Sequence, residues 1–380
     1  MRGFCWFACA ALLTGACSPG GGTGGQPEAS ESVGAESTSL VEPSTTGRTT
    51  VAETTTTELA PVALLPGEAW IVYEAPLYER DDGKGNRLVR PDGSDDHWAT
   101  PQVPIPRGGW QLHPDWSPDG SLLAFSADDA ADGDKPRELW TRDLWVSKPD
   151  GTGAERLLDC VLPCVTLDWP AWSPDGTRLA FMAHDEVGGS AAFRLDVMDM
   201  MTRAVTTVAT ASGPTGFAGP RWSPDGQRMV LEVGRYTDLG PEGSLSATAV
   251  AIVDLRDPTP TPTVITDGSL WATYPDWHPT EDLIVFSTRP WSALDDGPSN
   301  LYTVRPDGSA LTALTDFTTG QTRATQPTWT PDGTEIIFTA VEGTGFGEPT
   351  MAIVNRDGTA LRSATSSGPM FGTHPRLRPG

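Results

Sequence analysis

Lysine is nearly absent from this sequence, and basic residues are scarce altogether. Its 380 residues include only three lysines, and 26 Lys and Arg residues stand against 50 Asp and Glu, which gives a net charge of −24. A protein this acidic offers no basic face to neutralise phosphates, so we expect no nucleic-acid partner. Anionic lipid surfaces are disfavoured for the same reason, so we expect membrane attachment only through an anchor.

The sequence also lacks an apolar run long enough to cross a bilayer. Residues 4–16, FCWFACAALLTGA, are apolar but short, and Cys17 follows them. This arrangement resembles a bacterial lipoprotein signal, which implies that residues 1–16 are a cleaved signal peptide and that Cys17 carries the lipid. Ordinary secretion with cleavage near Ala16 is the alternative, because Thr14 stands where such signals usually have Leu or Val. Both interpretations export the protein, and the first anchors it on the extracytoplasmic face of the cell membrane.

Apart from Cys17, only two cysteines remain after the signal, Cys160 and Cys164 in LLDCVLPCVTLD. A close pair in an exported protein predicts a disulfide, which would contribute roughly 2 kcal/mol by the chain-entropy estimate. A redox or metal site is the alternative, although two cysteines cannot complete a closed zinc site.

Aromatic residues are missing from residues 18–66, which are rich in Thr, Ser, Gly, Glu and Pro. Such a segment cannot bury enough apolar surface to offset its conformational entropy. Residues 17–66 are therefore predicted to be the lipidated cysteine followed by a disordered stalk, and residues 67–380 to be the folded domain.

The folded domain repeats one phrase five times. The copies have the form Pro-x-Trp-Ser/Thr-Pro-Asp-Gly, with Pro279-Thr280-Glu281 in a degenerate one, and their tryptophans are Trp116, Trp172, Trp222, Trp277 and Trp329. A period of about 50 residues, with two alternating apolar strands after each phrase, predicts an all-β propeller of four-stranded antiparallel blades. Tryptophan would pack between blades and Pro-Asp-Gly would make a tight turn, so we interpret the phrase as structural.

The two ends of the domain complete the predicted ring. Residues 373–380, THPRLRPG, copy the start of the phrase, and residues 69–75, AWIVYEA, supply the strand that should follow it. We therefore predict six blades, the last shared between the termini. The phrase resembles the WD40-like Pro-Asp repeats of TolB-like six-bladed propellers. TolB itself has an α/β domain where this protein has its stalk, so the resemblance is not extended to a Tol–Pal role.

Function is expected where the repeats differ, on the face that carries the variable loops. Candidate binding residues in these loops are Tyr236, Trp291, Phe346, Asp128 and Asp132. The acidic run Asp128, Asp129, Asp132 and Asp134 could hold Ca²⁺ or simply be a solvated loop, since it lacks the EF-hand spacing.

A second set of candidates follows from the residue before each motif proline, which should lie at the mouth of the central channel. These residues are His113, Trp169, Gly219, Tyr274, Gln326 and His374. Because the ring closes, Gln326, His374 and His113 are consecutive. They could bind a divalent metal or a carboxylate-bearing ligand, or they could bond only loop backbone and water.

The sequence favours a binding or scaffold module over an enzyme. It has no Gly-x-Ser-x-Gly elbow and no phosphate-binding glycine loop, so we name no catalytic residue. We expect a monomer that binds an envelope protein, peptide or glycan and needs no cofactor. The alternative is a metal-dependent lyase or hydrolase acting on acidic carbohydrate, similar in idea to propeller lyases of pectin-derived sugars, with a metal at His113, His374 and Gln326.

Overall fold

The computed structural model of the protein describes residues 67–74, 85–100, 102–106, 108–136, 139–188, 190–212, 215–236, 245–288, 298–318, 322–342, 349–365 and 372–380. The predicted signal peptide and stalk, and the loop candidates Trp291 and Phe346, lie outside these ranges. Of Tyr236 only the backbone is described, as the last residue of a strand. No helix in the described ranges is long and apolar enough to span a membrane.

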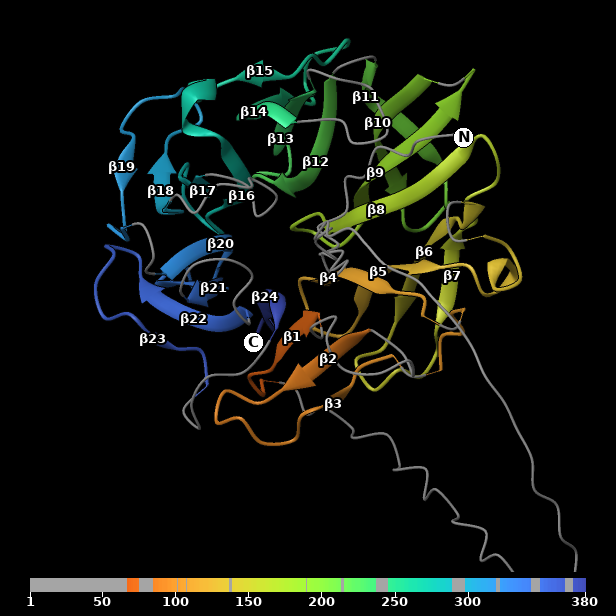
Figure 1. Cartoon of the computed structure of the whole chain (residues 1–380), viewed down its shortest axis with the longest axis horizontal. Helices are drawn as coiled ribbons and strands as arrows, with labels where there is room; N and C mark the ends of the chain where they lie inside the picture. Colours follow the sequence, from red (N-terminus) through yellow and green to blue (C-terminus); the bar gives the residue numbers. More distant parts are fainter. Residues whose placement is uncertain are drawn as a thin grey trace, which may run out of the picture. The chain divides into compact units, whose positions relative to one another are not determined.

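Secondary structure in these ranges consists of β-strands and short 3-10 helices such as η1 (Ala130–Asp132) and η3 (Gly268–Leu270) (Figure 1). Four antiparallel sheets contain four strands each. In strand order they are β24 (Thr373–Leu377), β1 (Ile71–Glu74), β2 (Asn86–Val89) and β3 (His97–Trp98); β12 (Thr215–Trp222), β13 (Arg228–Tyr236), β14 (Leu245–Asp254) and β15 (Thr263–Val264); β16 (Ala272–Trp277), β17 (Ile284–Thr288), β18 (Leu301–Val304) and β19 (Thr312–Ala313); and β20 (Thr322–Trp329), β21 (Glu335–Glu342), β22 (Pro349–Asn355) and β23 (Arg362–Ser363).

The remaining eight strands form one sheet, so the pairing does not give the six separate sheets that the sequence predicts. These strands are β4 (Gln111–Trp116), β5 (Leu123–Asp128), β6 (Arg142–Ser147), β7 (Glu155–Leu158), β8 (Cys164–Trp172), β9 (Arg178–Val187), β10 (Ser190–Asp199) and β11 (Val205–Ser212). Strands β4 to β7 and β8 to β11 are antiparallel within each group, and a single parallel pair, Arg142 with Thr166, joins β6 to β8. The long β8 starts early enough to run beside β6, which merges the two groups.

The inner strands of successive sheets contact one another in sequence. β4 contacts β8, and contacts continue through β12, β16, β20 and β24, which returns to β4. The C-terminal strand β24 pairs with β1, with Ile71 opposite Leu377 and Val72 opposite Arg376 (Figure 1). The two ends of the folded domain therefore share one sheet, as the sequence analysis predicts.

The motif tryptophans lie between neighbouring inner strands. The indole of Trp222 is buried and its Nε1 donates to the carbonyl of Ala171, 2.9 Å away on β8. The Nε1 of Trp116 donates to the carbonyl of Arg376 on β24 at 3.2 Å. A buried apolar cluster continues from β8–β10 to β12–β14 around Trp222. Each of these two tryptophans therefore fills the gap where one sheet meets the next.

The turn after each tryptophan is built from its own side chains. In the second copy, Asp175 accepts hydrogen bonds from the Ser173 hydroxyl at 2.7 Å and from the Thr177 N–H at 3.0 Å. Gly176 has φ +69°, which only glycine adopts without strain. In the degenerate copy His278 Nδ1 accepts from the N–H groups of Thr280 and Glu281, which replaces the missing aspartate.

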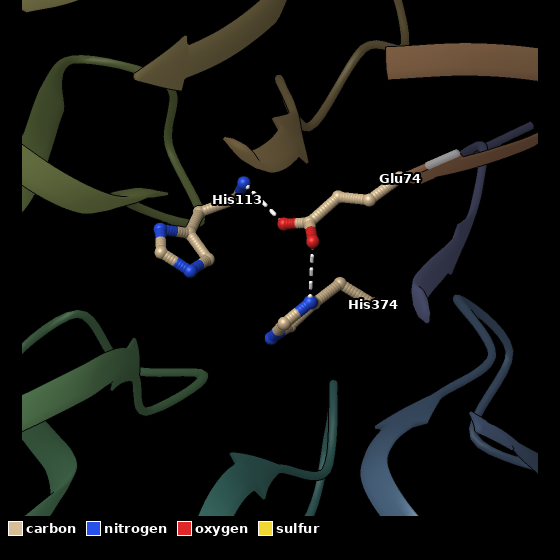
Figure 2. A group of neighbouring side chains, drawn as sticks. All are labelled: Glu74, His113 and His374. Carbon is tan, nitrogen blue, oxygen red and sulfur yellow. Dashed lines mark hydrogen bonds and ion pairs between the residues drawn. The ribbon is translucent and has the colours of Figure 1, made fainter. Parts of the chain in front are cut away.

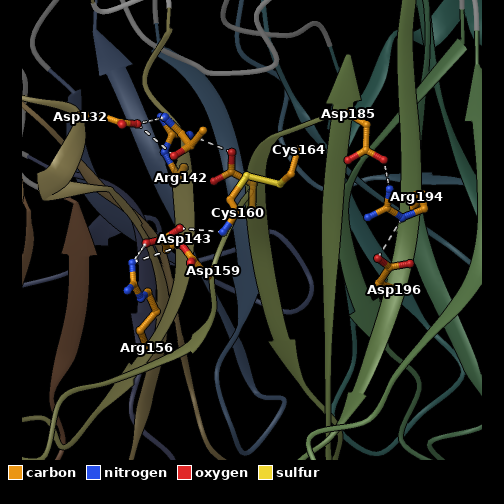
Figure 3. Close-up of a disulfide and its surroundings, with 12 residues drawn as sticks. Asp132, Arg142, Asp143, Arg156, Asp159, Cys160, Cys164, Asp185, Arg194 and Asp196 are labelled. Carbon is orange, nitrogen blue, oxygen red and sulfur yellow. Dashed lines mark hydrogen bonds and ion pairs between the residues drawn. A yellow bond between two sulfur atoms is a disulfide. The ribbon is translucent and has the colours of Figure 1, made fainter. Parts of the chain in front are cut away.

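Cys160 and Cys164 form a disulfide, as predicted (Figure 3). Both cysteines are buried, and the Cys160 N–H donates to Asp143 at 2.9 Å. Asp143 and Asp159 share the guanidinium of Arg156 next to it. The disulfide thus closes a loop just before β8, and these contacts give it a structural role.

Candidate binding site at the centre of the propeller

Each inner strand is interrupted at the residue before its proline. The strand ladder shifts register there in β4, β8, β12, β16 and β20, and also between β1 and β24. We call the six residues at these positions the central ring; all have φ between +50° and +58°, and they are His113, Trp169, Gly219, Tyr274, Gln326 and His374. Five of them carry side chains, for which this backbone conformation costs of order 1–3 kcal/mol each. Strain of this kind, repeated at one place in the fold, marks a candidate functional site.

The side chains of the central ring pack against each other. The His113 ring is stacked on Trp169, with ring centroids 3.6 Å apart. His374 presents its edge to Trp169 at 5.2 Å and to Tyr274 at 5.9 Å between centroids. Gln326 reaches His374 through its amide, 2.9 Å from Nε2. The five residues with side chains that the sequence places at the channel mouth therefore lie together.

His113 is held by a series of buried charges. Its Nδ1 lies 3.1 Å from Asp168, which also accepts from Arg142 at 2.8 Å, and Arg142 in turn contacts Asp128 at 2.9 Å. Burial alone would raise the pKa of Asp168, but Arg142 and His113 hold it well below its usual range. Burial lowers the pKa of His113, with Asp168 opposing the shift. His113 is therefore neutral at pH 7, with its proton on Nδ1 and a free electron pair on Nε2.

Glu74 joins the two histidines from β1, although no sequence pattern marks it as a site residue. Its Oε1 accepts from the His113 N–H at 2.7 Å and its Oε2 lies 2.9 Å from His374 Nδ1 (Figure 2). Burial would raise the pKa of Glu74, but the two histidines lower it to about 2. Figure 2 shows its carboxylate between His113 and His374.

These groups can be tested as a metal centre. One atom from each of Glu74, His113 and His374 lies within 4.8 Å of the other two, and two imidazoles with one carboxylate suit zinc, manganese or iron. His374 Nδ1 also lacks hydrogen-bond geometry towards its neighbours in the described part of the protein.

Gln326 argues against a metal on His374. Its Oε1 accepts from Thr339 at 2.8 Å and from the His374 N–H at 3.1 Å, so its NH₂ group must face His374 Nε2. A neutral His374 then carries its proton on Nδ1, the atom that a metal would need. The set fits a cluster in which Glu74 accepts from the His113 N–H and lies close to His374 Nδ1 better than it fits a metal centre.

A second layer lies two residues further along each inner strand. It consists of Asp115, Ala171, Arg221, Asp276, Thr328 and Arg376. Arg376 Nε is 3.3 Å from Asp115, and Arg221 Nε is 3.6 Å from Asp276. The sequence could have predicted these residues, because strand side chains alternate in direction and each second-layer residue lies two positions after a member of the central ring.

A small cavity lies between the two layers. Its volume of about 20 Å³ suits roughly one water molecule. Its lining includes Trp169, Gly219, Tyr274, Gln326 and His374 from the central ring, and Arg221, Thr328 and Arg376 from the second layer.

The loop candidates Asp128 and Asp132 are already occupied by protein groups. Asp128 accepts from the Trp110 N–H and pairs with Arg142, and both contacts are 2.9 Å long. Asp132 accepts from the Thr141 N–H at 2.6 Å and contacts Lys135. Both carboxylates are buried and bonded within the protein, so the acidic run does not present them to a calcium ion.

Four-stranded antiparallel sheets whose inner strands surround this lined centre define a β-propeller of the TolB-like class. The fold matches TolB of Acinetobacter baumannii with a TM-score of 0.57 at 15% identity, over 82% of this chain and 67% of that one. A TolB-like protein of Agrobacterium tumefaciens matches with a TM-score of 0.52 at 19% identity, over 80% of this chain and 90% of that one. At such identities the likeness concerns the fold, and function must be argued from the site.

Sequence comparison adds two relatives. An uncharacterized protein of Agrobacterium fabrum is 26% identical over 226 residues, which are 58% of this chain and 67% of that protein. The Tol-Pal system protein TolB of Alcanivorax borkumensis is 33% identical over 66 residues, 17% of this chain and 14% of that protein. No family model matches the sequence.

Proposed function

We propose that this protein is an exported propeller, tethered to the membrane, that binds a protein, peptide or glycan ligand at its central ring. The observation that carries the proposal is the strained backbone of the ring, where His113, Trp169, Tyr274, Gln326 and His374 all keep side chains at positive φ. A purely structural position would favour glycine, as at Gly219.

The proposed architecture has six blades. The eight-stranded sheet counts as two, because β4–β7 and β8–β11 are each antiparallel and share only one residue pair. Each blade then contributes one residue to the central ring. The ring therefore offers six positions of one backbone geometry, five of which carry side chains, and this variety suits recognition of an asymmetric ligand.

The proposed tether is the lipidated Cys17 with the stalk of residues 17–66. A lipid label in growing cells, followed by membrane fractionation, tests it. Wild-type protein should take up the label and sediment with membranes, whereas Cys17→Ser should do neither. A labelled Cys17→Ser protein would overturn the anchor while leaving the binding proposal intact.

The second candidate function is a metal-dependent lyase or hydrolase acting on acidic carbohydrate. The observation in its favour is the cluster of Glu74, His113 and His374, and the observation against it is the amide of Gln326, which places a proton on His374 Nδ1. Metal analysis of the purified protein separates the two candidates. Stoichiometric metal that is lost in His113→Ala would support the enzyme.

Affinity capture from cross-linked cell envelopes tests the binding proposal. We compare full-length wild type with the double variant Trp169→Ala, Tyr274→Ala and with the turn variant Thr177→Ala as control. The same ligand should be recovered with wild type and with the control and lost with the double variant. Equal recovery with all three proteins would contradict a central binding site. Thermal unfolding of each variant separates lost binding from lost fold.

A further inference from the structure

The cavity between the two layers has an unusual lining for so acidic a protein. Two guanidinium groups, Arg221 and Arg376, face it, together with the imidazole of His374. No aspartate or glutamate is among the described residues that line it. In a protein of net charge −24, a cavity lined by two arginines and no acid favours an anionic group.

The two arginines keep free donor groups. Arg221 donates through Nη1 to the carbonyl oxygens of Pro170 and Pro220, and Arg376 donates through Nη1 to the Thr328 hydroxyl. Their contacts with Asp115 and Asp276 are 3.3 to 4.0 Å long, and none of these contacts has hydrogen-bond geometry. Each guanidinium therefore retains N–H groups that could form a shorter, paired contact with a carboxylate.

The two neighbouring aspartates compensate these charges incompletely. Neither aspartate lines the cavity, and burial raises the pKa of Asp276 to about 7 and that of Asp115 to about 6, while Arg221 lowers both. Near neutral pH Asp276 is therefore protonated in part of the molecules. The two aspartates are therefore weaker partners for the guanidinium groups than ordinary ionised aspartates.

Gly219 provides the opening. It is the one member of the central ring without a side chain, and it lies between Trp169 and Tyr274 in ring order. A Cβ atom added there would have Trp169 Cε3, at 3.9 Å, as its nearest neighbour, so the space next to it is open. The centroids of these two aromatic rings are 5.9 Å apart, so the rings contact each other and an entering group would have to pass beside Gly219. A cavity of about 20 Å³ has no room for a sugar ring.

From this geometry we propose that the cavity binds one oxygen of a peptide carboxylate, in the place of a water molecule, and that this carboxylate belongs either to an acidic residue or to a peptide's C-terminus. Arg221 and Arg376 would hold the carboxylate, and Trp169 and Tyr274 would contact the peptide that carries it. This inference rests on the proposed binding role of the central ring and specifies the chemistry of its ligand.

The test is a calorimetric titration of the full-length protein at constant ionic strength. The probes are acetate, its neutral analogue acetamide, galacturonate, and the acetylated peptide Gly-Gly-Glu with an amide end beside its Gln counterpart. A tripeptide of glycine with a free C-terminus, compared with its amide, separates a terminal carboxylate from an acidic residue. We expect saturable 1:1 binding of acetate and of at least one carboxylate peptide, and none of acetamide or the neutral peptides. Galacturonate that binds tighter than every peptide would overturn the peptide assignment in favour of a uronate.

Three variants locate the binding. Gly219→Gln adds the side chain that the ring already carries at Gln326 with nearly the same φ, so it should fold and fill the opening. It and Arg376→Gln should weaken carboxylate binding about ten-fold or more, a loss typical of a charged hydrogen-bonded pair. The exposed Arg256→Gln changes net charge by as much as Arg376→Gln and should leave binding unchanged.

If Arg376→Gln fails to fold, Gly219→Gln still tests the site, because it narrows the cavity without removing a charge. Wild-type affinity in Gly219→Gln, or no saturable acetate binding in wild type, would refute the carboxylate site. A ligand whose capture requires Trp169 and Tyr274 but is unaffected by Arg376→Gln would refute the carboxylate site alone and leave the proposed function standing.

Discussion

The Pro-Asp-Gly turns and the central ring are both repeated around the propeller, but they are repeated differently. At the turns backbone and side chains recur together, with Asp175 accepting from the hydroxyls of Ser173 and Thr177 and Asp332 accepting from those of Thr330 and Thr334. At the central ring the backbone conformation recurs while the residue type varies, with histidine at two positions and Trp, Gly, Tyr and Gln at the other four. Turns that repeat both their backbone and their side chains meet a packing requirement that all blades share. The central ring repeats only its backbone conformation and brings varied side chains together at one place, as a binding site requires.

The largest effect on stability should come from the packing between blades. Trp222→Ala removes a buried indole, its hydrogen bond to the Ala171 carbonyl and its contact with the Arg178 guanidinium, 4.4 Å from the ring. We expect the free energy of unfolding to fall by about 3–5 kcal/mol. Denaturant unfolding measures this, with the more exposed Trp98→Ala as the matched control. Equal losses for the two variants would contradict the packing role of the motif tryptophans.

Substituting either of two glutamates near the central ring should change the free energy of unfolding, and the two changes should have opposite signs. Burial raises the pKa of Glu232 from 4.5 to about 7, against hydrogen bonds from Thr273 and Tyr274. Glu232 therefore supports the folded state below pH 4.5, and this contribution is lost as the pH rises towards 7. The pKa of Glu74 is instead lowered to about 2, so its contribution is present above pH 4.5 and is lost as the pH falls towards 2.

At pH 8 the two matched variants should differ clearly in their free energy of unfolding. Glu232→Gln removes the cost of ionising a buried carboxyl and should raise the free energy of unfolding by on the order of 2 kcal/mol. Glu74→Gln should instead lower it, because a neutral amide is a weaker acceptor for the buried His113 N–H than the carboxylate is. Denaturant unfolding at pH 4, 6 and 8 would give, for each variant and for wild type, the dependence of the free energy of unfolding on pH. Shifts of the same sign at pH 8 would contradict the assigned charge states.

The disulfide lies outside the central ring and should matter only for stability. Replacing Cys160 and Cys164 with serine opens a short loop and should cost about 2 kcal/mol. Ligand affinity should not change, in contrast to the ring variants. A loss of ligand affinity larger than the loss of folded protein would give the disulfide loop a role in binding.

The smallest effect should come from a single turn. Asp175→Ala removes hydrogen bonds from Ser173 and Thr177 at a partly exposed site, so we expect a loss of about 1 kcal/mol or less. The turn at Pro279 already folds with histidine in place of this arrangement. Thermal unfolding would detect the change, and a loss as large as that of Trp222→Ala would show that the turns do more than join strands.

The sequence predicts the propeller and the central ring well because both follow from one repeated phrase. Counting to the residue before proline finds His113 and His374, which lie far apart in sequence and have ring centroids 5.1 Å apart in the fold. The same count continued by two residues would have found Arg221 and Arg376. Glu74 could not be found this way, because it lies outside the phrase and reaches the ring only through the pairing of β1 with β24.

Other features depend on contacts that no repeat encodes. The parallel pair between Arg142 and Thr166 joins two groups of strands into one sheet, and neither residue is in the motif. Asp128 and Asp132 belong to an acidic run that suggests a calcium site by composition. Their roles as internal acceptors depend on Arg142 and Thr141, which β6 and the residue before it place beside them.

Site-specific photo-cross-linking compares the two repeated regions most directly. A photoreactive phenylalanine replaces Tyr274 in the central ring in one protein and the exposed turn residue Gln227 in another, both in full-length protein in living cells. The proposed function predicts a discrete cross-linked product from position 274 that Gly219→Gln abolishes, and none from position 227. The same product from position 227 alone would place ligand binding at the turns and contradict a binding site at the centre.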